Sequence, residues 1–83
     1  MKKMLVKWSQ NVKATGYELV YSKNTDFTDA QSVTITDGTA TSREIPDVDP
    51  DTVYYVRIRA AMRSNGTTYY SAYSTYKSVM ISK

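Results

Sequence analysis

The stretch VDPDTVYYVRIRA, residues 48–60, decides the fold of this 83-residue chain. Pro50 and the aspartates beside it are typical of a turn. Residues 54–60 then alternate between apolar and polar side chains. Because successive side chains of a β-strand point to opposite faces, this alternation predicts a strand with one buried face. Tyr54 stands just inside that strand, where its ring can be buried while its hydroxyl bonds to backbone upstream.

The same alternation with a period of two extends over most of the chain, and no window has the spacing of an amphipathic helix. Turn-forming sequences such as Asp37-Gly38 and Ser64-Asn65-Gly66 separate the alternating segments. Short strands with regular turns favour an all-β sandwich. We predict a single domain over residues 1–83, with strands at about 4–9, 16–22, 32–36, 42–46, 53–62 and 69–81.

The composition excludes several classes of site. The chain has no cysteine and no histidine, so a disulfide, a thiolate zinc site and a histidine-activated nucleophile are excluded. No apolar run approaches the ~18 residues of a membrane span. The basic start Met1-Lys2-Lys3 is followed by an apolar stretch too short for a signal peptide. A net charge of +3 is ordinary for a solubilising surface and predicts no nucleic-acid partner.

The acidic residues do not form a convincing catalytic or metal site. Asp47, Asp49 and Asp51 alternate as the first ligands of a calcium loop do. The glycine and the final glutamate that such a loop needs are here Thr52 and Ile58. We therefore expect a solvated acidic turn, no cofactor, no metal ligand and no catalytic residue. The predicted core consists of the inward apolar positions Val6, Trp8, Tyr17, Leu19, Tyr21, Ile45, Val48, Tyr54, Val56 and Ile58.

In this order and spacing the motifs resemble a fibronectin type III domain over nearly the whole chain. Val6-Lys7-Trp8 is similar to that family's strand B, and Gly16–Tyr21 to its strand C. Val48-x-Pro50-x-Thr52-x-Tyr54 is similar to its turn into strand F. Ala14-Thr15-Gly16-Tyr17 and Tyr69-Tyr70-Ser71-Ala72 have close counterparts in modules of surface or secreted proteins of Gram-positive bacteria.

The resemblance implies an immunoglobulin-like sandwich of two sheets, with the predicted strands as B, C, C′, E, F and G. It also implies chain ends at opposite ends of the sandwich, which suits head-to-tail strings of domains. The family's strand A is missing or vestigial here, so the 4–9 strand has an unpaired edge, and Leu5 points outward. Because exposed edges invite pairing, we expect self-association through this edge, or a domain clipped from a longer chain.

A stripe of basic and aromatic residues has two interpretations. It could be a ligand face for sugars or a protein partner, because arginine and aromatic rings stack on both. It could instead be structural, with Arg57 and Arg59 interleaving with Tyr73. That arrangement resembles the arginine–aromatic ladder of cytokine receptors, where Ser71–Ser74 would be a degenerate Trp-Ser-x-Trp-Ser motif. We favour the structural interpretation. The stripe comprises Tyr55, Arg57, Arg59, Arg63, Tyr70 and Tyr73.

The loops at 23–29 and 63–68 are further candidate binding sites. Some fibronectin modules carry an Arg-Gly-Asp signal in the second loop, and this chain has none. Asn65-Gly66-Thr67 fits the glycosylation pattern. We expect a tight turn there instead, with Gly66 at positive φ.

The resemblance thus predicts a non-enzymatic extracellular or cell-surface module that spaces or presents neighbouring domains of a parent protein. The first alternative is a carbohydrate- or protein-binding module that uses the Arg57, Arg59 and Tyr73 face or the 63–68 loop. The second is an engineered or excised scaffold without a native ligand.

Overall fold

The computed structural model describes residues 2–83, and strands are its only regular elements in that range. Their alternating β-branched and aromatic residues fit a pleated, half-buried surface. The strands are β1 (Lys2–Lys7), β2 (Gly16–Ser22), β3 (Gln31–Ile35), β4 (Ser42–Val48), β5 (Thr52–Ser64), β6 (Thr67–Tyr70) and β7 (Lys77–Ile81).

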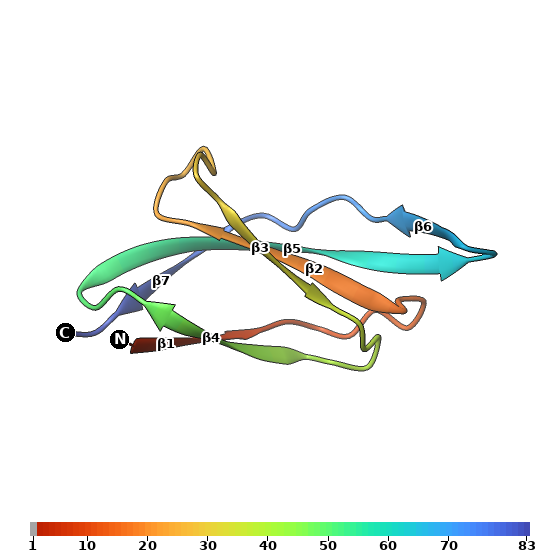
Figure 1. Ribbon diagram of the computed structural model, residues 1–83, viewed down its shortest axis with the longest axis horizontal. Helices are drawn as coiled ribbons and strands as arrows, with labels where there is room; N and C mark the ends of the chain where they lie inside the picture. Colours follow the sequence, from red (N-terminus) through yellow and green to blue (C-terminus); the bar gives the residue numbers. More distant parts are fainter. Residues whose placement is uncertain (1) are drawn as a thin grey trace.

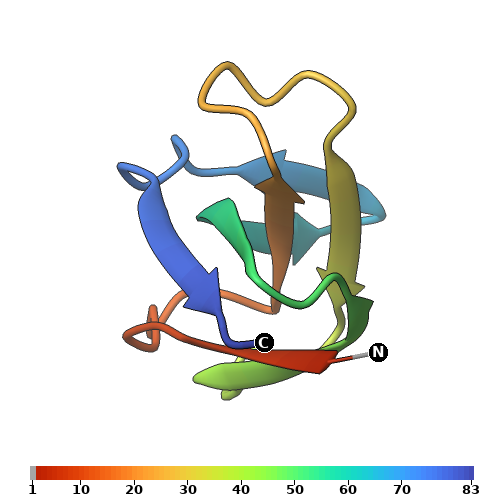
Figure 2. The ribbon, with the colours of Figure 1, turned by 90° about the vertical axis from the view of Figure 1, so that its left-hand side faces the viewer.

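The strands form two antiparallel sheets that face each other (Figures 1 and 2). The smaller sheet pairs β1 with β4. The larger sheet has the order β3-β2-β5-β6, and β7 pairs with the same central strand, β5. The molecule is therefore an all-β sandwich, as the sequence predicted, and it measures 45 × 23 × 18 Å.

The hydrophobic core lies between the two sheets, and most of its predicted members are buried. Trp8, Tyr21 and Ile58 are exceptions, because they are only partly buried and pack against the core cluster. Trp8 lies just beyond the end of β1. Residues that we did not predict complete the core: Met4, Ile35, Ala60 and Ile81.

Two tyrosine hydroxyls fasten loops to this core. The backbone N–H of Asp49 donates a hydrogen bond to Tyr54 Oη over 2.9 Å, which confirms the predicted bond to upstream backbone. Tyr17 Oη accepts from the N–H of Asn11 and donates to the C=O of Gly38. Buried tyrosines need such partners, so each ring anchors the loop beside it.

The prediction of one strand over residues 69–81 is wrong. β6 pairs with residues 61–64 of β5, and β7 pairs with residues 52–56. The intervening segment, residues 71–76, follows the edge of β5 without forming regular strand pairs. Serine side chains supply part of the missing strand pairing there.

The prediction of chain ends at opposite ends of the sandwich is also wrong for the described residues. Lys2 pairs with Val48, and the N–H of Asp51 donates to the C=O of Ser82. The start of β1 and the end of β7 therefore meet beside the turn at 48–51 (Figure 1). The β5–β6 hairpin projects at the other end of the long axis.

Candidate functional site

On the outward face of β5, two arginines alternate with aromatic rings from neighbouring segments, and we call this arrangement the ladder. Arg57 contacts the rings of Phe27 and Tyr73, with its guanidinium carbon 4.2 and 4.3 Å from their centroids. Arg59 contacts Tyr73 at 4.6 Å and Tyr70 at 3.8 Å. A cation within about 6 Å of a ring centroid is attracted by the ring's quadrupole. The two arginines therefore interleave with Tyr73, as the structural interpretation expected.

Glu18 neutralises one rung of the ladder from the neighbouring strand β2. Its Oε1 accepts from Arg59 Nε at 2.9 Å and Nη2 at 2.8 Å, and also from the hydroxyl of Tyr73. Burial raises the pKa of Tyr73, and the hydrogen bond to Glu18 raises it further. Arg57 has no ion-pair partner among residues 2–83. The Arg59 end of the ladder is thus satisfied internally.

Two serines hold the segment 71–76 against β5 and so position Tyr73. Ser71 donates its N–H to the C=O of Ala60 and accepts the Ala60 N–H on Oγ, at 3.0 and 2.9 Å. Ser74 does the same with Ile58, at 2.8 and 3.1 Å. The hydroxyls accept hydrogen bonds from backbone N–H groups of β5 that a regularly paired strand would have satisfied. The spacing Ser-x-x-Ser places Tyr73 between these two attachments.

The structure brings only some residues of the predicted stripe together. Arg57, Arg59, Tyr70 and Tyr73 come together in the ladder. Tyr55 lies beside it, with its ring 5.5 Å from that of Tyr76 in an edge-on contact. Arg63 stays exposed near the β5–β6 turn, and none of the ladder's cation–ring contacts involves it.

Phe27 and Tyr76 are ladder contacts that the sequence interpretation missed. Their rings meet edge-on at 6.0 Å, and Phe27 covers Arg57. Phe27 is the only phenylalanine of the chain and lies in a polar loop, where period-two alternation carries no information. A lone large apolar residue in the 23–29 loop was the one available signal. This loop therefore contributes one ring to the ladder.

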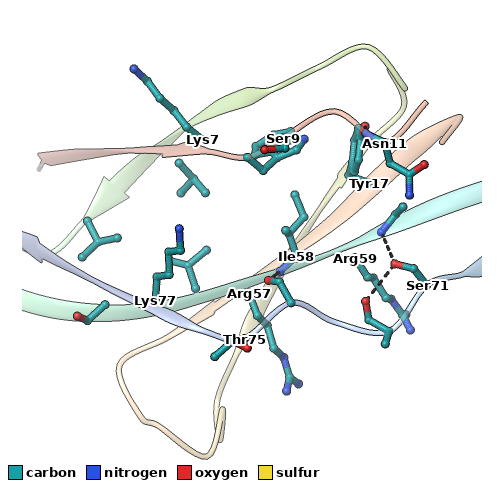
Figure 3. Close-up of a pocket in the computed structure, with 18 of the residues that line it drawn as sticks. Lys7, Ser9, Asn11, Tyr17, Arg57, Ile58, Arg59, Ser71, Thr75 and Lys77 are labelled. Atoms are coloured by element: carbon teal, nitrogen blue, oxygen red, sulfur yellow. Dashed lines mark hydrogen bonds between the residues drawn. The ribbon is translucent and has the colours of Figure 1, made fainter. Parts of the chain in front are cut away.

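A groove of about 520 Å³ lies between β1 and the stretch that runs from β5 to β7 (Figure 3). Its walls come from residues 5–9 on one side and from residues 71–79 on the other, over apolar side chains such as Ile58. Every charged residue that lines it is basic: Lys7, Arg57, Arg59 and Lys77. Trp8 Nε1 is buried beside this groove without a hydrogen-bond acceptor among residues 2–83. The sequence interpretation did not identify this groove.

The 63–68 loop forms the tip of the projecting hairpin. Ser64 pairs with Thr67, so only Asn65 and Gly66 form the turn, at φ 51° and 79°. Two positive φ values are what a type I′ hairpin turn requires, which confirms the tight turn predicted at Gly66. All side chains from Arg63 to Tyr70 are exposed, and Tyr69 is 58% exposed. The tip is thus the most accessible of the candidate sites.

The acidic turn offers little to a metal ion. Asp49 forms an ion pair with Lys23, while Asp47 and Asp51 take positive φ values at bends of the backbone. Within residues 2–83 no three carboxylates are grouped closely enough to hold a metal ion. The same residues include no helix of the length and apolarity needed to cross a membrane.

Comparison of the chain with models of protein families found no match. Comparisons with curated proteins and with solved structures likewise found no similar protein.

Proposed function

We propose that this chain is a fibronectin type III-like, non-enzymatic module of an extracellular or surface protein, and that it presents its β5–β6 hairpin to a ligand. Neighbouring domains of the parent protein would hold the opposite end. The hairpin ligand would be a glycan or a protein, because exposed tyrosine and arginine suit both.

The observation that carries this proposal is the position of the two chain ends relative to the hairpin. The start of β1 and the end of β7 meet beside the turn at 48–51, while the exposed hairpin tip projects at the far end of a 45 Å molecule (Figure 1). A module attached through its chain ends would therefore hold the tip away from its parent. A string of domains joined head to tail is less well supported by this arrangement.

The ladder fits a supporting role within the same proposal. It joins the 23–29 loop, β5, β6 and the 71–76 segment through cation–ring contacts. Each such contact contributes about 0.5–1 kcal/mol at an exposed site. We infer that the ladder stiffens the strand that carries the hairpin, since rings of the chain itself cover Arg57 and Glu18 already pairs with Arg59.

The test is retention on beads, with the protein coupled through the end of the chain at Lys83. Cell-wall fractions, insoluble polysaccharides and extracellular matrix proteins are offered to the wild type and to an Arg63→Ser, Tyr69→Ser variant. The matched control is Met80→Ser, which removes a 60% exposed apolar side chain from β7 at the attached end. The melting temperature of each variant is measured to establish that it is folded.

We expect specific retention that the hairpin variant loses and the Met80 variant keeps. Retention that both variants keep would move the ligand site away from the hairpin. No retention of any probe would leave the spacer function, in which the hairpin has no ligand. Turnover that depends on one carboxylate would contradict a non-enzymatic module.

A further inference from the structure

The outer edge of β1 is unpaired within residues 2–83. Trp8 donates its N–H to the C=O of Thr41 directly opposite, and the register places Val6 opposite Arg43. Alternate residues of an antiparallel strand bond to the partner, so the N–H and C=O groups of Leu5 and Lys7 point away from β4. These groups form an open template for another strand.

The outer edge of β4 is closed to such pairing, which makes the contrast informative. Pro46 has no N–H, and it occupies an outward position in the register with β1. Asp47 follows it at φ 62°, which bends the strand. Proline and bends are devices that protect a sheet edge from another chain. β1 has no proline, and its one irregularity of register lies between Lys2 and Met4, before the stretch 5–7 in which Leu5 is 54% exposed.

The groove beside β1 extends this template into a site for side chains. Residues 5–9 form one wall (Figure 3), and the apolar residues Val6, Ile58 and Val79 are among those that line the groove. A strand added to β1 would turn every second side chain toward this apolar lining. Trp8 Nε1–H is buried beside the groove and has no acceptor among residues 2–83.

The charge of the groove selects the kind of strand. All its charged lining residues are basic, and Lys7 and Lys77 form no ion pair with the described residues. A second copy is a poor occupant, because antiparallel pairing of two β1 strands about Leu5 sets Lys3 of each copy opposite Lys7 of the other. Like charges placed directly opposite are destabilising. The self-association expected from the sequence is therefore disfavoured, while an acidic strand is favoured.

We propose that β1 and the groove beside it bind an extended acidic segment of a separate protein chain as an added antiparallel strand. The backbone of the segment bonds to Leu5 and Lys7, its apolar side chains enter the groove beside Lys77, and its outward carboxylates face Lys7. Main-chain bonds supply affinity in this binding mode, and the alternate side chains supply specificity. The site is separate from the hairpin, so it stands or falls independently of the proposed function.

The first measurement is fluorescence anisotropy with a synthetic peptide of about seven residues in which valine and glutamate alternate, a length typical of a strand. A matched peptide carries lysine in place of glutamate. We expect the acidic peptide to bind and the basic one not to bind. Amide hydrogen exchange should show the Leu5 and Lys7 amides protected by the acidic peptide.

Three variants test the mode of binding. Lys7→Glu with Lys77→Glu should weaken the acidic peptide at least about fivefold, the effect of about 1 kcal/mol from lost and reversed ion pairs. Lys13→Glu is the matched control, because Lys13 is exposed and lies outside the groove. Leu5→Pro removes an outward donor at the kind of position that Pro46 occupies on β4, so it should abolish binding in a folded protein.

Equal weakening by Lys13→Glu, or unprotected Leu5 and Lys7 amides, would overturn the proposal. Dimers of the protein alone that Leu5→Pro dissociates would assign the edge to a second copy instead. Should Leu5→Pro fail to fold, the charge-reversal pair and the exchange of the two amides still decide the question.

Discussion

Single side chains determine how the loops of this sandwich are held. Tyr54 and Tyr17 each place a ring in the core and a hydroxyl against loop backbone. The aromatic body contributes burial and the hydroxyl contributes direction, so one residue joins a loop to the core.

The Tyr54→Phe variant tests this role at the turn before β5. It retains the ring but leaves the part-buried N–H of Asp49 without its acceptor. We expect a loss of about 1–2 kcal/mol in the free energy of unfolding, measured by urea denaturation. Tyr69→Phe is the control, since its exposed hydroxyl makes no hydrogen bond to residues 2–83. An equal effect of both substitutions would contradict the anchor.

Gly38 tests a close approach between two loops. A Cβ at this position would lie 2.0 Å from the backbone oxygen of Ala14, so the 36–41 loop or the loop after β1 must move. We expect Gly38→Ala to destabilise the fold by about 1–3 kcal/mol, as overpacking commonly does. Chemical denaturation measures this loss as a lower free energy of unfolding. Unchanged stability would show that these loops do not touch in solution.

At the scale of elements, the ladder joins the 23–29 loop, β5, β6 and the 71–76 segment. We expect Arg57→Met, which keeps the length of the side chain but not its charge, to lower stability by about 1–2 kcal/mol through two lost cation–ring contacts. Arg43→Met on β4 is the matched control, because Arg43 is exposed and makes no such contact.

A double-mutant cycle gives this prediction its sharpest form. Arg57→Met and Phe27→Leu should couple, since each removes one partner of the same 4.2 Å contact. Additive effects of the two substitutions would show that Phe27 covers Arg57 without stabilising it.

The ladder was predictable only in part. Arg57, Arg59 and Tyr73 stand on alternating or motif positions, so their meeting could be inferred from the sequence. Phe27 could not, because a turn built on Asp26 and Thr28 brings it to the sheet, and such turns leave no periodic signal. The break between β6 and β7 was missed for a related reason. Ser71 and Ser74 fit a strand pattern, yet their hydroxyls take the place of backbone pairing with β5.

At the scale of the whole molecule, titratable groups predict a stability profile with two limbs. Hydrogen bonds from Thr28 and Thr39 lower the pKa values of Asp26 and Asp37 below 3.8. The unfolded chain then binds protons first as the pH falls below 3.8, so stability declines. Burial raises the pKa of Tyr73 above 10.0, so the unfolded chain loses its proton first and stability declines as the pH rises above 10.0.

Urea denaturation across the pH range checks both limbs. Asp37→Asn should flatten the acid limb and leave the alkaline limb unchanged. Tyr73→Phe should flatten the alkaline limb alone. A variant that alters neither slope would show that its group titrates alike in the folded and unfolded chain.

The sequence by itself determined the all-β class, the turn at 48–51, most of the core and the exclusion of cysteine and histidine sites, because these follow from local alternation and residue type. Only the tertiary structure decided which ends of the chain meet, how the arginines are covered and where the basic groove lies. Lys7 and Lys77 are distant in the sequence and share a groove only because β1 and β7 belong to facing sheets. Alternation sets which face of a strand is buried, but the pairing of strands sets which surfaces become neighbours.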